Sequence, residues 1–431
     1  MADFKKLKKH AKHTVYVRPD SMLSRVLRVI SVAGELGSQS IYLFGVNEKG
    51  ENKYSRVKRI LLNDVIYRSA VNEFLYEGVG FTERGKGQYK TIRPKMDTIV
   101  SVFNSVPEGQ ELIANFTWSS LPSSRDHVGR NIKLAEILII CLRTGVSFDL
   151  IKNPTIYDTG ALNSQGSEGI GIVPNRPRKV EKTIFYPMKE VRKRDSKVGL
   201  SEVGSRSYGY FVTTKGVYEC FNLNRNMCWN YKTEENLAFY TKLFAEINFG
   251  FRFNFEPPNA ICFTNSYEDA QTVIYNSERM SKGNGKFRTS ETSKMFKDVF
   301  SNTYCFIKNE EGIKQFELFL KPEFERKIAN YFLEEGDNCI ESAKRCTFRC
   351  SAFESKDRVA YLFFFGGNMN ELYSCYVAKT SGYFKFNSKL VIYCYPHQEA
   401  YIDSLFKECE NVEIVVKSLE EIEDVFCKNI D

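Results

Sequence analysis

The end of the chain alternates apolar, β-branched runs with amphipathic runs, and this pattern constrains the fold more than any other feature. Residues 390–396 are LVIYCYP and residues 412–417 are VEIVVK, both typical of buried strands. Residues 397–410 and 419–429 each have the apolar spacing of a helix. Consecutive parallel strands need a long crossover, usually a helix, so this alternation predicts a parallel sheet covered by helices. We therefore expect a mixed α/β domain at the C-terminus.

Length and charge divide the chain. A single core rarely extends to 431 residues, so we expect two or three domains. Residues 1–95 hold 19 Lys and Arg against 9 Asp and Glu, a net charge of +10, whereas the whole chain carries +8. The other residues are therefore nearly neutral. This asymmetry favours a polyanion-binding module attached to a neutral body.

The first hundred residues have the element order of a winged helix. Residues 21–37 and 38–45 predict two helices that end at glycines, and residues 47–67 predict a third with a basic side. Residues 73–94 then surround ERGKGQ, a glycine-containing turn suited to a hairpin. In a winged helix the third helix enters the major groove and the hairpin, or wing, lies along the DNA backbone.

This layout assigns DNA contacts to specific side chains. Arginine pairs well with guanine, asparagine with adenine, and lysine neutralises phosphates. We expect base contacts from Arg56, Arg59 and Asn63, and phosphate contacts from Lys53, Arg84, Lys86 and Lys90. Two alternatives to DNA binding remain. A surface helix whose Lys and Arg are merely solvated has the same pattern, and some winged helices bind proteins.

The domain boundaries follow from these patterns. We expect a basic N-terminal arm at residues 1–13, a winged-helix DNA-binding domain at 14–96 and a helical connecting segment at 97–158. A linker or long loop rich in Gly, Ser, Asn and Pro follows at 159–178, and the mixed α/β domain, of unknown role, covers 179–431.

The sequence lacks the residues that several classes of enzyme require. The chain has only four His, and no two of them are separated by a single residue, which excludes relaxases of the His-hydrophobic-His type. A Walker-type phosphate loop and a dinucleotide-binding glycine fingerprint are also missing, so no cofactor is expected. Cys339, Cys346 and Cys350 lie close in sequence, but the fourth ligand and the close pairs of a zinc site are absent, so we expect no resident metal.

A metal-dependent nuclease of the restriction type remains an alternative. Such an enzyme uses an acid followed by Glu-x-Lys to hold Mg²⁺ and to activate water. The segment FESKD supplies Glu354 and Lys356, and Asp337 lies upstream. Only under this alternative would the protein use Mg²⁺.

Composition also bears on the compartment. The 12 Cys are scattered, mostly among apolar neighbours, as in a reduced cytosol. The charged start MADFKKLKKHAKH has no apolar run behind it, and we find no span of about 20 apolar residues. We therefore expect a cytoplasmic protein without a membrane partner.

The N-terminal third resembles the replication-relaxation proteins of Gram-positive plasmids and conjugative elements. The resemblance lies in residues 23–30, the third helix at 54–66, the wing at 85–89 and the helical segment at 125–142. It implies sequence-specific binding of double-stranded DNA in replication, transfer or regulation of a mobile genetic element. The alternatives are the nuclease guided by its winged helix and a scaffold that docks a protein. A homodimer or a protein partner would use the C-terminal domain.

Overall fold

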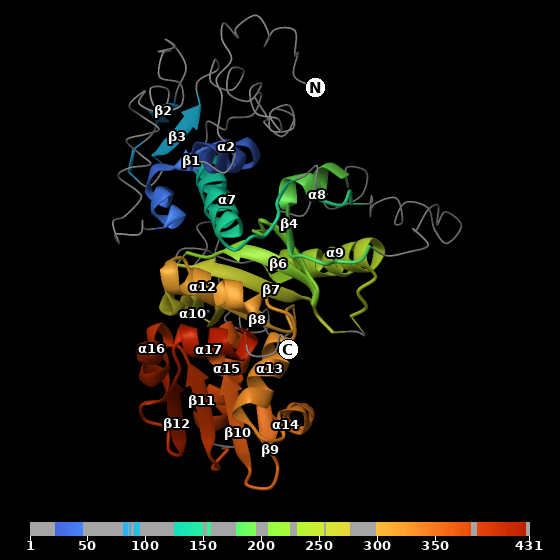
Figure 1. The fold of residues 1–431 in the computed structure, drawn as a ribbon, viewed down its shortest axis with the longest axis vertical. Helices are drawn as coiled ribbons and strands as arrows, with labels where there is room; N and C mark the ends of the chain where they lie inside the picture. The colour runs from blue at the N-terminus through green and yellow to red at the C-terminus, as the bar shows by residue number, and fades with distance from the viewer. Residues whose placement is uncertain are drawn as a thin grey trace, which may run out of the picture. The chain divides into compact units, whose positions relative to one another are not determined.

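The computed structural model of the chain describes residues 22–45, 81–84, 86–87, 90–94, 125–149, 153–156, 178–194, 206–224, 231–253, 256–275, 299–380 and 386–427. The chain divides into two compact units, Met1–Asn153 and Pro154–Asp431. Figure 1 labels their helices and strands. The fold is mixed α/β with three sheets, as the sequence predicts at this level.

The first unit combines helices with a small antiparallel sheet. Its described elements are α2 (Met22–Ala33), β1 (Leu36–Gly37), the 3-10 helix η1 (Ser38–Phe44), β2 (Phe81–Arg84), β3 (Thr91–Pro94) and α7 (Arg125–Arg143). The sheet order is β1-β3-β2, with Leu36 opposite Ile92 and Phe81 opposite Pro94. The predicted hairpin and the first helix are confirmed. The second helix is present as a 3-10 helix, and the third predicted helix lies outside the described residues.

Helix α7 packs closely on this unit. Its residues Ala135 and Ile137 to Cys141 are fully buried. A Cβ atom at Gly37 would lie 2.8 Å from the Ile132 side chain, so glycine permits the close approach. Polar contacts add to the packing, because Asn131 donates to Glu35 at 3.1 Å and Ser40 donates to Glu136 at 2.9 Å.

The second unit begins with a five-stranded sheet. The strands are β4 (Ile184–Pro187), β5 (Gly209–Thr213), β6 (Gly216–Asn222), β7 (Asn259–Thr264) and β8 (Thr303–Ile307), in that order across the sheet. Strands β4, β5 and β6 are antiparallel, and β6, β7 and β8 are parallel. The helices between and after them are α8 (Met188–Arg194), α9 (Tyr231–Phe249), α10 (Tyr267–Tyr275) and α12 (Glu310–Phe319).

A four-stranded sheet follows in the same unit. It contains β9 (Ala352–Glu354), β10 (Val359–Phe363), β11 (Leu390–Cys394) and β12 (Val412–Val416), in the order β12-β11-β10-β9. Strands β10, β11 and β12 are parallel and β9 is antiparallel to β10. Its helical elements are α13 (Phe324–Phe332), α14 (Gly336–Ala343), η6 (Phe364–Gly366), α15 (Met369–Thr380), α16 (Pro396–Phe406) and α17 (Leu419–Cys427). The predicted strand–helix alternation is confirmed.

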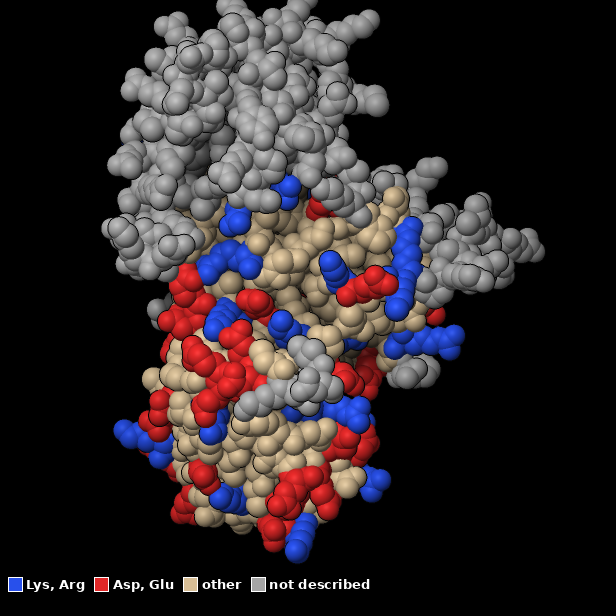
Figure 2. Space-filling view, viewed as in Figure 1, with Lys and Arg blue, Asp and Glu red and all other residues tan. Residues whose placement is uncertain are grey.

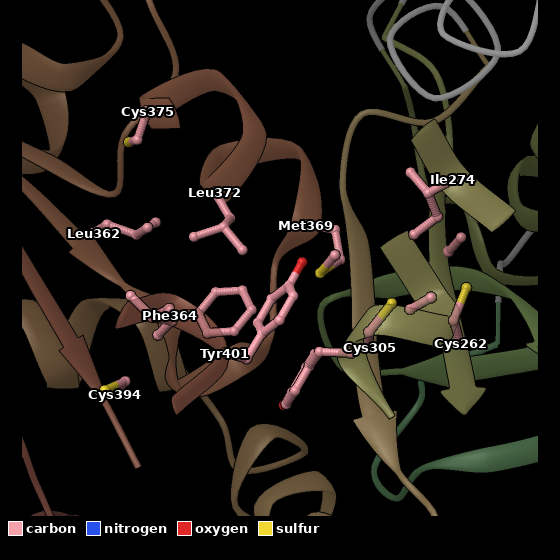
Figure 3. Close-up of a cluster of buried hydrophobic side chains, with 14 of the residues drawn as sticks. Cys262, Ile274, Cys305, Leu362, Phe364, Met369, Leu372, Cys375, Cys394 and Tyr401 are labelled. Carbon is pink, nitrogen blue, oxygen red and sulfur yellow. The ribbon is translucent and has the colours of Figure 1, made fainter. Parts of the chain in front are cut away.

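One apolar core joins the two sheets. Figure 3 shows Met369 and Tyr401 between Cys305 of the first sheet and Leu362 and Cys394 of the second. All five side chains are buried, and their continuity makes the second unit one folding body. Among the helices that the structure describes, none is long and apolar enough to cross a membrane.

Candidate functional site

A groove of about 1140 Å³ opens in the second unit. It is bounded by the start of β8, by α13 and α14, by the loop at 346–351 and by one side of α15. Its lining mixes aromatic side chains with carboxyl, amide and hydroxyl groups. This size and composition are typical of sites for small molecules.

The two sheets are held at a fixed spacing where the groove begins. Strand β10 leads through Gly366 and Gly367 into α15, and Gly367 has φ +67°. A Cβ at Gly367 would lie 2.2 Å from the carbonyl oxygen of Cys305, so only glycine fits here. The Gly367 carbonyl in turn accepts a hydrogen bond from the Cys305 amide at 2.9 Å. The backbone of β8 therefore directly contacts the β10–α15 turn.

Hydrogen bonds of side-chain amides also connect the start of α15 to the five-stranded sheet. Asn368 donates to Asn302 at 2.9 Å, and Asn302 donates to Asn259 at 3.0 Å. Asn370 donates to the carbonyl oxygens of Phe300 and Ser301. These bonds position the first turn of α15 against the strands of the five-stranded sheet.

Glu371 lies in that first turn and faces the groove. Its carboxylate accepts a hydrogen bond from the Ser351 hydroxyl at 2.6 Å, and Ser351 itself accepts one from the Phe363 amide at 3.0 Å. Burial raises the pKa of the Glu371 carboxyl, and the neighbouring Glu325 raises it further, against the hydrogen bond from Ser351 and the charge of Arg349. No cation of the described chain forms an ion pair with Glu371.

Tyr304, on strand β8, is a second polar residue of the groove. Its side chain is 8% exposed and lines the groove. Burial and the charges of Glu325 and Glu371 raise the pKa of its hydroxyl, so the phenol is neutral. Within the described residues this hydroxyl makes no hydrogen bond. The groove therefore contains a carboxyl and a phenol close enough to affect one another.

The cations near the groove already have partners. Lys215 contacts Glu325 at 3.0 Å and donates to the carbonyl oxygen of Phe319 at 3.2 Å. Lys344 contacts Glu341 at 2.6 Å, and Arg349 donates to the carbonyl oxygen of Ser301. The two exposed cations of the rim are thus directed at protein oxygens.

Three thiols form one wall of the groove region. Cys350 and Cys375 are buried and Cys346 is partly exposed. Burial raises the pKa of all three thiols, so each is protonated at neutral pH and is a poor nucleophile or metal ligand. In the described part of the chain no group of three His, Cys, Asp or Glu side chains is arranged to hold a metal ion.

The structure places only part of the predicted DNA-binding set. Lys53, Arg56, Arg59 and Asn63 lie outside the described residues. Arg84 ends β2, Lys86 is exposed in the hairpin turn, and Lys90 directly precedes β3. Arg84, Lys86 and Lys90 therefore lie on one hairpin, and their contact with DNA stays a prediction.

The predicted nuclease residues lie on different elements. Asp337 is in the first turn of α14, where Arg326 donates to both of its oxygens at 2.8 and 2.7 Å. Glu354 ends the edge strand β9 and accepts a hydrogen bond from the Tyr361 hydroxyl at 3.0 Å. Lys356 is exposed in the turn between β9 and β10. The Asp337 carboxylate is thus used in an ion pair.

Comparison of the chain with known protein families, with curated proteins and with solved structures found no match. The groove itself is not among the sequence predictions. Its residues extend from Glu256 to Ala378 and are brought together only by tertiary packing. The one local signal is the pair of glycines after a strongly apolar strand, which marks a close backbone approach.

Proposed function

We propose that the protein binds double-stranded DNA through its first unit, which acts as a winged helix. The observation that carries this proposal is the order and pairing of the described elements. A helix, a short strand, a 3-10 helix and a hairpin follow one another, and the short strand pairs with the second strand of the hairpin. This is the layout in which a hairpin serves as a wing beside a groove-binding helix.

Charge supports the same proposal. The net charge of +10 lies within residues 1–95, and Lys86 is exposed where the hairpin turns. Gly87, with φ +58°, permits the tight turn that presents this lysine. Over the described face of the second unit, by contrast, Figure 2 shows Asp and Glu interspersed with Lys and Arg. Clustered cations release counterions from DNA, so the first unit is the better candidate for the contact.

Binding of a random pool of double-stranded DNA across a salt series tests the proposal with the full chain. We expect affinity to fall steeply as salt rises, and the retained pool to be enriched in one sequence. Arg59→Ala is expected to cost about 1–3 kcal/mol on the enriched site and to relax its specificity. Lys86→Ala is expected to weaken binding to all sequences and to reduce the salt slope by about one.

A matched control is Lys321→Ala, which removes an exposed cation from the second unit. We expect it to leave DNA binding unchanged. If the full chain retains no DNA even at low salt, the proposal is wrong. If Arg59→Ala and Lys86→Ala have equal effects on every sequence, DNA binding stands but base recognition by Arg59 does not.

The resemblance to replication-relaxation proteins extends the proposal to a mobile genetic element. Under this extension the enriched sequence would occur at the origin or transfer region of such an element. The nuclease alternative receives less support, because Arg326 binds the carboxylate that would have to hold Mg²⁺. Incubation of the enriched DNA with Mg²⁺ tests for cleavage directly.

A further inference from the structure

We propose that the groove of the second unit binds a small organic molecule that carries a protonated amine on an apolar body. Three observations point to this class of ligand. They are a carboxyl without a paired cation, a tyrosine hydroxyl without a protein partner, and aromatic walls around the groove. The proposal concerns the second unit and is independent of DNA binding by the first.

Glu371 supplies the charge for an amine. One of its oxygens is bonded to Ser351, and no Lys, Arg or His of the described chain pairs with it. A partly buried carboxylate without a cation is costly, whereas a carboxylate paired with an ammonium group forms a strong, charge-assisted hydrogen bond. A bound amine would therefore supply the paired cation that Glu371 lacks within the described chain.

Tyr304 supplies a second polar contact. The Tyr304 residue is 8% exposed, and its hydroxyl makes no hydrogen bond to the described chain. Because Tyr304 lines the groove, a molecule bound there can supply the partner that this hydroxyl lacks in the protein. Tyr304, Glu325 and Glu371 line the same groove, so one bound molecule can contact the phenol and a carboxylate together.

The walls suit an apolar body next to a cation. Tyr304, Phe324, Phe348, Phe363 and Tyr373 all line the groove. The protein already holds one ammonium group in this way, since Lys215 Nζ lies 4.8 Å from the Phe319 ring centroid and 5.4 Å from that of Phe324. That lysine also pairs with Glu325. Carboxylate and aromatic faces thus combine to bind an amine at the groove's edge.

An anionic ligand fits less well. Arg349 and Lys344 are exposed and are directed at the Ser301 carbonyl and at Glu341. Glu371 repels an anion, and the remaining side-chain donors of the groove, such as Tyr304 and Tyr373, are neutral. A positively charged ligand is favoured on these grounds.

Three probes of nearly equal shape test the charge preference with the full chain: benzylamine, benzyl alcohol and benzoate. Binding is measured by ligand-observed saturation-transfer NMR at neutral pH, followed by titration. We expect benzylamine to bind, benzyl alcohol to bind more weakly and benzoate to bind weakest. Stronger binding of benzoate than of benzylamine, or no saturation transfer to any probe, would overturn the proposal.

Substitutions locate the site. Glu371→Gln should weaken benzylamine binding by about tenfold or more, as expected when a hydrogen bond to a charged group is lost. Tyr304→Phe should weaken it less, by a few-fold. Glu408→Gln removes the same charge from an exposed position of the second unit and should change nothing. Thermal unfolding of each variant separates a lost contact from a lost fold, and unchanged binding by folded Glu371→Gln would contradict the assignment.

Discussion

Two carboxylates on helices of the second unit differ in their partners and in the direction of their pKa shifts. Asp337 on α14 is exposed and receives hydrogen bonds from Arg326 on both oxygens, which holds its pKa below the usual value. Glu371 on α15 is enclosed, has one hydroxyl donor and no cation, and its pKa is raised by burial. The first carboxylate has an ion-pair partner, whereas the second has none among the described residues. The difference indicates that Glu371, and not Asp337, is the carboxylate available to a ligand. Substitutions can test this comparison.

The largest effect is expected where the groove's geometry is set. Gly367→Ala would place a Cβ 2.2 Å from the Cys305 carbonyl at a residue with φ +67°. We expect a loss of about 2–4 kcal/mol in the free energy of unfolding, because left-handed strain adds to a backbone clash. Urea denaturation measures this loss. Gly216→Ala is the control, since Gly216 also has positive φ but has nothing within 4 Å, and it should cost less.

That prediction concerns a contact that the sequence reveals only in part. The strands and helices from residue 390 onward are predictable because each apolar run has a clear period and is bounded by polar residues. The groove cannot be predicted in this way. Tyr304 lies in the apolar run TYCFI, where its sequence context is that of a core residue, and only the tertiary packing of α15 makes it part of a groove. The sequence also does not show whether η1 is an α-helix or a 3-10 helix, since a segment of seven residues is compatible with both.

Asp337 illustrates how little a motif identified from sequence alone says about the partners of its residues. Asp337, Glu354 and Lys356 have the order of a nuclease motif, but the partner of Asp337 is Arg326 on the preceding helix. Nothing in the motif's spacing contains this arginine. Sequence spacing identifies residue types that a reaction needs, whereas tertiary contacts decide whether those residues are available.

An intermediate effect is expected from the pH dependence of Glu371. Its folded pKa lies above the unfolded value, so its contribution to stability is complete below the unfolded pKa of about 4.3 and is lost as the pH rises through the folded pKa. Glu371→Gln should therefore gain stability relative to the natural protein between pH 4 and pH 7. Melting temperatures of both proteins across this range measure the gain. A difference that shrinks as the pH rises would contradict the raised pKa.

The smallest effect is expected at Asp337, with the opposite dependence on pH. Its folded pKa is lowered by Arg326, so its contribution is present above the unfolded pKa and is lost as the pH falls through the folded value. Asp337→Asn should therefore lower the melting temperature only slightly at pH 7, since exposed ion pairs contribute little. This loss should shrink as the pH falls below the unfolded pKa and through the folded one. Added salt should reduce the effect at pH 7, because Arg326 and Asp337 are both exposed to solvent. A loss that persists in high salt would mean that the Arg326–Asp337 contact positions α14 against α13, and the wall of the groove would then depend on it as well.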